Sequence, residues 1–222
     1  MNRNRPVIGI FLDTLFEDYG HRVWSGALEE VAAGKVSIVS CLGGSLKSPL
    51  FYYAQRNIVF DLFREDTVDA IVCVSGSIGI HITDDELKKF LSRYGDVPIV
   101  SVGQHVPGLA YVGIDNKTGM EQLVSHFIQA HGYKRIAFIR GPETNPEAEL
   151  RYLTYKETLA AHGLTFNPDL VANGDFQRHS GGDAMELLLD RRKISFDAVI
   201  AANDYMAINA MKALIERGIS VP

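Results

Sequence analysis

Residues 110–140 read AYVGIDNKTGMEQLVSHFIQAHGYKRIAFIR, and their pattern decides the fold. A short apolar run at 110–114 precedes a segment of helical period at 118–130, and a second apolar run follows at 135–140. In the middle segment the apolar residues between Met120 and Ile128 recur every three or four positions, which is typical of a helix with one buried face. The order strand, helix, strand predicts one repeat of a parallel α/β sheet.

The same alternation extends along the rest of the chain in both directions. Most of the predicted strands are continuous apolar runs, which indicates burial on both faces of a sheet covered by helices. The predicted strands are 7–12, 36–42, 70–75, 99–103, 110–114, 135–140, 170–172 and 198–202. The predicted helices are 22–33, 54–64, 85–94, 118–130, 148–161, 182–191 and 206–217.

The alternation is interrupted at 103–116, where two apolar runs are joined without a helix. We place the end of the first βαβ series there. We assign residues 1–132 to an N-terminal lobe and 133–222 to a C-terminal lobe. The predicted fold class is α/β, with two Rossmann-like, doubly wound parallel-sheet lobes.

Composition excludes several classes of protein. The 222 residues are 46% hydrophobic and 22% charged, which is typical of a globular protein. The net charge is -5, so the chain lacks the excess of basic residues that is typical of a nucleic-acid-binding protein. Cys41 and Cys73 stand in apolar runs, where we expect buried thiols in a reducing compartment. With no export signal and no run near the roughly 18 apolar residues of a membrane span, we expect a cytoplasmic protein without membrane contact.

Ligands of α/β proteins bind at the carboxyl ends of the strands, so the segments just after strands are the candidate site. In the first lobe, residues 13–20 combine carboxylates with aromatic rings, and Asp13 and Phe16 belong to this segment. An ordinary charged loop explains them equally well. Ser75 offers a hydroxyl beside a glycine, but the surrounding sequence is no nucleotide-binding motif.

In the second lobe, Arg151 lies near a strand end and could bind a ligand carboxylate or vicinal hydroxyls. A salt bridge to Glu147, one helical turn earlier, is an equally good interpretation. Phe176 offers an aromatic face, and Asn203 and Asp204 offer amide and carboxylate groups. The last two are also good helix N-cap residues, so alone they do not indicate function.

No catalytic constellation is present in the sequence. It lacks GxSxG, HExxH and CxxC motifs, and His105, His126 and His131 have no convincing metal-ligand spacing. We therefore predict no catalytic residue, no metal and no cofactor.

Four segments in order carry a resemblance to a known family. They are VGIDNKTG at 112–119, HFIQAHGYKRIAFIRGP at 126–142, ELR at 149–151 and DAVIAANDYMA at 197–207. They resemble the ligand-sensing domain of LacI/GalR-type regulators, which is similar to periplasmic sugar-binding proteins. The resemblance covers nearly the whole chain, and the succession of segments is more specific than any one of them.

The resemblance implies two lobes that close on a small polar effector, often a sugar or nucleobase, without catalysis. By position, Arg151 would clamp the ligand, Asn203 would hydrogen-bond it and Phe176 would stack on it. The loop at 13–16, Ser75 and Gln104 would line the opposite wall. The resemblance also implies a homodimer.

The chain departs from this family at both ends. Family repressors carry a helix-turn-helix module before the first strand, where only six residues stand here, so we expect DNA contact only through a module absent from the chain. Segments 43–46, 54–57 and 75–77 also resemble sensors fused to a C-terminal histidine kinase or diguanylate cyclase. The sequence stops before the family's next strand and return crossovers, so we expect an incomplete second lobe.

The leading hypothesis is a sensor domain whose lobes close on ligand and so control transcription or a linked signalling output. A transport-linked periplasmic sugar-binding protein would share the fold but requires an export signal. An enzyme of doubly wound fold is the third alternative, and the missing catalytic motifs disfavour it.

Overall fold

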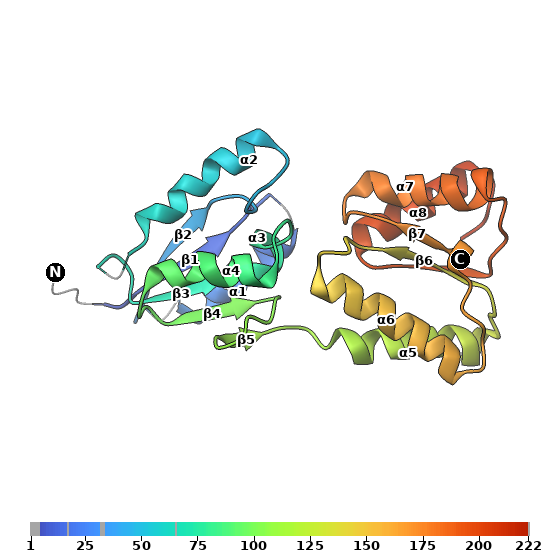
Figure 1. Ribbon diagram of the computed structural model, residues 1–222, viewed down its shortest axis with the longest axis horizontal. Helices are drawn as coiled ribbons and strands as arrows, with labels where there is room; N and C mark the ends of the chain where they lie inside the picture. Colours follow the sequence, from blue (N-terminus) through green and yellow to red (C-terminus); the bar gives the residue numbers. More distant parts are fainter. Residues whose placement is uncertain (1–4, 17, 32–33, 65, 222) are drawn as a thin grey trace. The chain divides into compact units, whose positions relative to one another are not determined.

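The described part of the chain folds into two compact units, and the division between them falls between Ile114 and Asp115. The computed structural model describes residues 5–16, 18–31, 34–64 and 66–221. Glu17, which belongs to the predicted polar loop, and the last two residues of the predicted helix 22–33 lie outside the described residues. Each unit is a parallel α/β sheet, as the alternation of strands and helices predicted (Figure 1).

Unit 1 contains a five-stranded parallel sheet in the order β2-β1-β3-β4-β5. Ile10 of β1 lies opposite Ser40 of β2 on one side and Val72 of β3 on the other. The strands are β1 (Val7–Leu12), β2 (Ser37–Leu42), β3 (Ala70–Cys73), β4 (Ile99–Val102) and β5 (Ala110–Val112).

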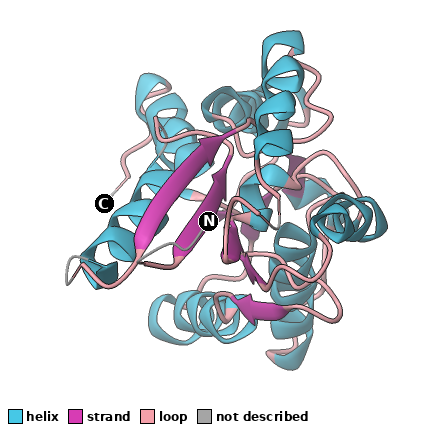
Figure 2. Cartoon of the chain, turned by 90° about the vertical axis from the view of Figure 1, so that its left-hand side faces the viewer, coloured by secondary structure: helices cyan, strands magenta, loops and turns pink. Residues whose placement is uncertain are grey.

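Helices cover both faces of this sheet, because its strands carry apolar residues on both sides (Figure 2). On one face Trp24 packs with Ile10, and its indole Nε1 donates a hydrogen bond to Ser40 Oγ at 2.8 Å. On the other face, the Phe11 ring packs against the Phe60 ring, with 5.1 Å between the two ring centroids. The helices are α1 (Asp18–Val31), α2 (Phe51–Arg56), the 3-10 helix η1 (Asn57–Leu62), α3 (Ser75–Ile78), α4 (Asp84–Leu91) and η2 (Ser92–Tyr94).

Two helical segments of unit 1 differ from the prediction. The expected helix 54–64 begins earlier and changes from α2 to the tighter η1 after Arg56. The single turn α3 was expected as a strand end and loop, and its residues Ser, Gly, Ser and Ile give no helical pattern. Helix α4 begins with a capping box, because the Thr83 side chain accepts from the Glu86 backbone N–H while the Glu86 side chain accepts from that of Thr83.

Unit 2 contains a three-stranded parallel sheet in the order β7-β6-β8. Helices α5 and α6 lie on one side of it, and α7 and α8 lie on the other (Figure 1). The strands are β6 (Ile136–Arg140), β7 (Val171–Asn173) and β8 (Ala198–Ala201). The helices are α5 (Asn116–His131), α6 (Pro146–Ala161), η3 (Pro168–Leu170), α7 (Arg178–Met185), the π-helix η4 (Glu186–Arg191) and α8 (Asp204–Glu216).

Helix α5 belongs to unit 2, although the sequence predicted a first lobe that extends to residue 132 and includes this helix. Met120 and Val124 of α5 join the same buried cluster as Phe138 of β6. Their packing is with the second sheet, so the division falls before the helix.

Burial also accounts for the two cysteines. Cys41 and Cys73 are free thiols and both are buried, as expected from their apolar runs. Burial raises the pKa of each thiol to about 12, so both stay protonated near neutral pH. Among the described residues, no helix is long and apolar enough to cross a membrane.

Candidate functional site

Arg151 lies on the second turn of α6, near the carboxyl ends of the unit 2 strands, and three acceptors hold its guanidinium. Nε donates to Asn116 Oδ1 at 2.8 Å, and Nη1 donates to the backbone oxygen of Ala202 at 2.8 Å. Nη2 lies 3.4 Å from Glu147 Oε2, so the salt bridge considered from the sequence is present. A planar group with five donors retains further N–H groups for a ligand.

Phe176 follows β7 and holds an aromatic ring over the loop that follows β6. A Cβ added to Gly141 would lie 2.3 Å from a carbon of this ring, so the close packing requires glycine there. The backbone of Phe176 is left-handed, with φ of 69°, a conformation that costs about 1 kcal/mol or more outside glycine. The ring is half-buried, so part of its surface stays accessible.

Asn203 supports Phe176 and begins α8 with the same side chain. Its Oδ1 accepts from the Met206 backbone N–H at 3.0 Å, and its Nδ2 donates to the backbone oxygen of Phe176 at 2.9 Å. Both ends of the amide are thus used within the protein, and the geometry favours the N-cap interpretation. Asp204 is the next residue, exposed in the first turn of α8.

These contacts join the predicted residues of unit 2 into one cluster. Arg151 binds the backbone of Ala202, which precedes Asn203, and Asn203 binds Phe176. The cluster brings together the ends of all three strands, as expected for residues that follow parallel strands. It offers a guanidinium, an aromatic ring and the carboxylate of Glu147, and the exposed Asp204 follows Asn203 in the chain.

Ser75 and Gln104 of unit 1 come together in the interior of their own unit. Ser75 is fully buried, and its Oγ lies 2.6 Å from Ser101 Oγ and donates to the backbone oxygen of Val102 at 2.9 Å. Gln104 is 5% exposed, its backbone N–H donates to Ser75 Oγ at 3.3 Å, and its side chain donates to Asp84 at 2.6 Å. This geometry favours an internal role for both, joining the ends of β3 and β4.

The loop after β1 is the accessible part of the unit 1 prediction. Asp13 is half-buried, whereas the Phe16 side chain is 94% exposed. Tyr19, in the first turn of α1, brings its hydroxyl over the ends of β3 and β4, because a Cβ on Gly103 would lie 2.8 Å from that oxygen. This loop and the start of α1 thus supply an exposed aromatic ring, a phenol and a carboxylate, which are groups that suit a polar ring-shaped ligand.

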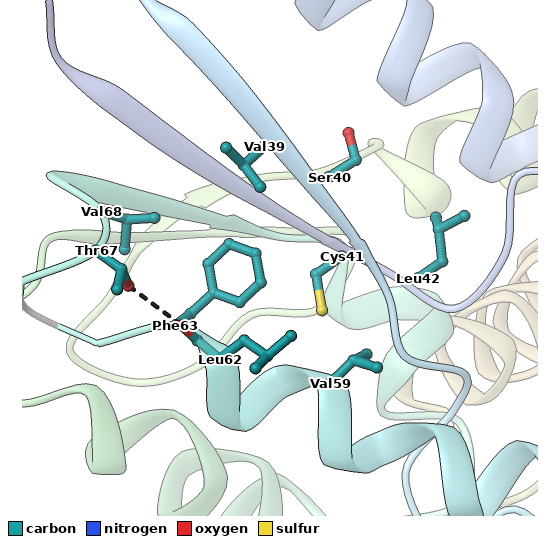
Figure 3. Close-up of a pocket in the computed structure, with 9 residues that line it drawn as sticks. All are labelled: Val39, Ser40, Cys41, Leu42, Val59, Leu62, Phe63, Thr67 and Val68. Atoms are coloured by element: carbon teal, nitrogen blue, oxygen red, sulfur yellow. Dashed lines mark hydrogen bonds between the residues drawn. The ribbon is translucent and has the colours of Figure 1, made fainter.

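Unit 1 also contains an apolar hollow of about 540 Å³ between β2 and η1 (Figure 3). Its polar side chains are engaged: Ser40 accepts from the Trp24 indole, and Thr67 Oγ1 donates to the backbone oxygen of Arg64 at 2.9 Å. The hollow contains none of the predicted ligand residues and offers a polar ligand little to bind. The lining residues are Val39, Ser40, Cys41, Leu42, Val59, Leu62, Phe63, Thr67 and Val68.

Sequence reasoning missed Asn116 as part of the site and treated Glu147 only as a salt-bridge partner. Asn116 is 8% exposed and holds Arg151 from a position 35 residues earlier, which no local pattern reveals. Burial raises the pKa of the Glu147 carboxyl, against the lowering effect of Arg151 and a hydrogen bond from Asn116. Throughout the described ranges, no group of three His, Cys, Asp or Glu side chains could hold a metal ion.

Comparison with known proteins shows what the chain is similar to. Residues 124–222 match the family described as Periplasmic binding protein-like domain. The chain is 43% identical over 111 residues to the HTH-type transcriptional regulator AscG of Escherichia coli, covering 50% of this chain and 32% of AscG. It is 40% identical over 143 residues to the HTH-type transcriptional regulator CelR of Thermobifida fusca, covering 63% of this chain and 41% of CelR. It therefore spans less than half the length of these curated relatives.

Solved structures agree with the sequence matches. The transcriptional regulator CelR-cellobiose complex has a TM-score of 0.77 at 29% identity, covering 99% of this chain and 66% of the other. The crystal structure of the Escherichia coli repressor AscG has a TM-score of 0.72 at 28% identity, and the match covers 98% of this chain and 75% of the AscG chain. The fold of this chain is thus similar to that of these regulators, and residues 124–222 match a periplasmic binding protein-like domain.

In sequence and in fold, the chain is thus similar to transcriptional regulators of the LacI family. The relatives reported above are named as transcriptional regulators or repressors. They give no support to the resemblance to kinase-linked or cyclase-linked sensors.

Proposed function

We propose that this chain is the effector-binding part of a cytoplasmic transcriptional regulator, and that its effector is a small sugar-like or nucleobase-like molecule. The observation that carries the proposal is the cluster at the strand ends of unit 2, where Arg151 is held in place by three acceptors and Phe176 by Asn203. A fixed donor beside a fixed ring is suited to a small ring with hydroxyl groups. Asp13 and Phe16 of unit 1 are the other contacts we propose.

The regulatory output is inferred from the relatives. AscG and CelR are named as HTH-type transcriptional regulators, and the CelR structure is described as a cellobiose complex. We propose that this chain acts as a homodimer, without catalysis, and that DNA is bound by a module outside these 222 residues. As the family resemblance implies, ligand would favour a closed arrangement of the lobes.

Thermal unfolding of the full-length protein tests the proposal. The panel contains cellobiose, glucose, ribose, adenosine, hypoxanthine and several amino acids. A compound at 100 times its dissociation constant stabilises the folded protein by about 2.7 kcal/mol, which gives a clear shift in Tm. We expect a shift with one sugar-like or nucleobase-like compound, whereas a shift only with amino acids, or with no compound, would contradict the proposed effector class.

Arg151→Ala then tests the site with the compound that binds. Loss of charge-assisted hydrogen bonds worth roughly 1.5–3 kcal/mol each should weaken binding by about tenfold to a hundredfold. Arg192→Ala is the matched control, because Arg192 donates to the backbone oxygens of Asp169 and Val171, outside the strand-end cluster. Equal affinity in the wild-type protein and Arg151→Ala would remove Arg151 from the site.

A further inference from the structure

Glu147 has one buried carboxylate oxygen that lacks a hydrogen-bond donor among the described residues, although Asn116 donates to this carboxyl group. Its Oε1 is buried and accepts no hydrogen bond from the residues that the structure describes. Its Oε2 lies 3.4 Å from Arg151 Nη2, whereas the other two acceptors lie 2.8 Å from the guanidinium. The Glu147 contact is therefore the longest of the three and the most easily exchanged for a ligand. A buried acceptor without a donor is costly, so a donor from the ligand would be favourable.

The carboxylate also sets the charge of the site. The side chains of Arg151 and Glu147 are 18% and 22% exposed, so water screens their charges only in part. When Glu147 is ionised, the pair is neutral overall, and a phosphate or carboxylate approaching Arg151 also meets the negative charge of Glu147. An uncharged hydroxyl group meets no such repulsion, since it can donate to Glu147 and accept from Arg151.

We propose that Glu147 makes this site selective for uncharged, hydroxyl-bearing ligands and rejects phosphorylated or otherwise anionic ones. The Glu147 carboxylate, whose side chain is 22% exposed, accepts a hydroxyl hydrogen from the ligand, and a neighbouring ligand oxygen accepts from the remaining N–H groups of Arg151. The inference rests on the proposed function, because it assumes that Arg151 faces the ligand. It goes beyond that function in naming the charge of the ligand and the residue that selects it.

Inorganic phosphate is a direct probe, since it tests the charge of the site without knowledge of the natural effector. In the full-length protein, Glu147→Gln keeps the shape of the side chain and removes its charge. We expect the dissociation constant for phosphate, measured by calorimetry, to fall by about tenfold or more relative to wild type. Adding Arg151→Ala to this variant should abolish the gain.

Glu149→Gln is the matched control, because it removes a carboxylate two residues away on the same helix. Glu149 pairs with Arg140 at 2.5 Å, and neither residue contacts Arg151 in a described interaction. Its phosphate affinity should equal that of wild type, and thermal unfolding should show that all variants are folded. An equal gain in Glu149→Gln would overturn the inference, since it would reflect net charge alone.

The outcomes separate this inference from the proposed function. Unchanged phosphate affinity in Glu147→Gln overturns the inference, even if cellobiose or adenosine binds the wild-type protein and so supports the proposed function. A gain that depends on Arg151 supports the inference. If that gain occurs while no sugar or nucleobase compound binds, the charge selection stands and the proposed effector class fails.

Discussion

The side-chain amide of Asn203 donates to the backbone oxygen of Phe176 at 2.9 Å, and so the residue that caps α8 also holds the aromatic ring of the candidate site. Phe176 has a left-handed backbone, which is unfavourable for a residue with a side chain. The hydrogen bond from Asn203 and the packing of the ring on Gly141 offset that cost. The position of the ring is therefore set by the start of a helix 27 residues further along the chain.

Replacing Asn203 should destabilise the protein in two separable steps. Asn203→Ala loses the N-cap and the bond to Phe176, with an expected cost of about 1–3 kcal/mol in urea unfolding. Asn203→Asp keeps the capping oxygen but loses the amide donor, so its free energy of unfolding should lie between those of wild type and Asn203→Ala. An Asp variant as stable as wild type would show that the bond to Phe176 contributes nothing.

Gly141→Ala should displace the ring of Phe176, because the new methyl group would lie 2.3 Å from a ring carbon and 2.8 Å from the Ala148 side chain. We expect destabilisation of about 1–3 kcal/mol from overpacking and weaker effector binding by calorimetry. Gly119→Ala is the control, since nothing lies within 4 Å of the added carbon in α5. It should stabilise the protein by about 0.5–1 kcal/mol, and equal effects of both substitutions would refute the close contact.

The raised pKa of Glu147 predicts a pH dependence of stability. Its main cause is burial, so the folded protein holds this proton at higher pH than the unfolded chain, whose Glu pKa is about 4.3. The folded state binds more protons between the two pKa values, so stability falls as pH rises through that window. Glu147→Gln should remove this contribution. We expect Tm measured from pH 4 to 8 to fall less steeply with pH in the variant, and parallel curves would contradict the prediction.

Asp197 should act in the opposite direction. The backbone N–H groups of Lys134 and Arg135 donate to its Oδ2 at 2.9 Å each, and these bonds lower the pKa of the carboxyl. Its contribution is fully present above the unfolded pKa of about 3.9 and is lost as pH falls through the lower folded value. Asp197→Ala should therefore reduce Tm at pH 7 and have a smaller effect in strong acid. A deficit that is equal at pH 7 and pH 2 would show that the charge is not involved.

Much of the fold could be predicted from the sequence, because parallel strands that are buried on both faces consist of consecutive apolar residues. β1 was predicted at its observed bounds, and the other strands lie within one or two residues of the prediction. The helices α1, α5 and α6 begin earlier than predicted, because their first turns are polar and lack the apolar period. The place of α5 in unit 2 could not be predicted, since its apolar face would fit either sheet.

The sequence could predict only those residues of the candidate site that directly follow a strand or lie in the next helix turns. Residues after neighbouring strands meet at one edge, which is why Arg151, Phe176 and Asn203 form one cluster. The sequence could not show that Ser75 and Gln104 turn into the interior, or that Asn116 reaches Arg151. These contacts depend on side-chain direction and on separations of about thirty residues, neither of which follows from local pattern.

Trp24 is the one tryptophan of the sequence, and it lies in unit 1, where its indole binds Ser40. Tryptophan fluorescence therefore reports on the unfolding of unit 1 alone. Far-UV circular dichroism, by contrast, records the helices of both halves. If the two signals change at different denaturant concentrations, the units unfold separately and no single free energy describes the protein. If an effector held by Arg151 brings the two transitions together, it has coupled two folding units into one.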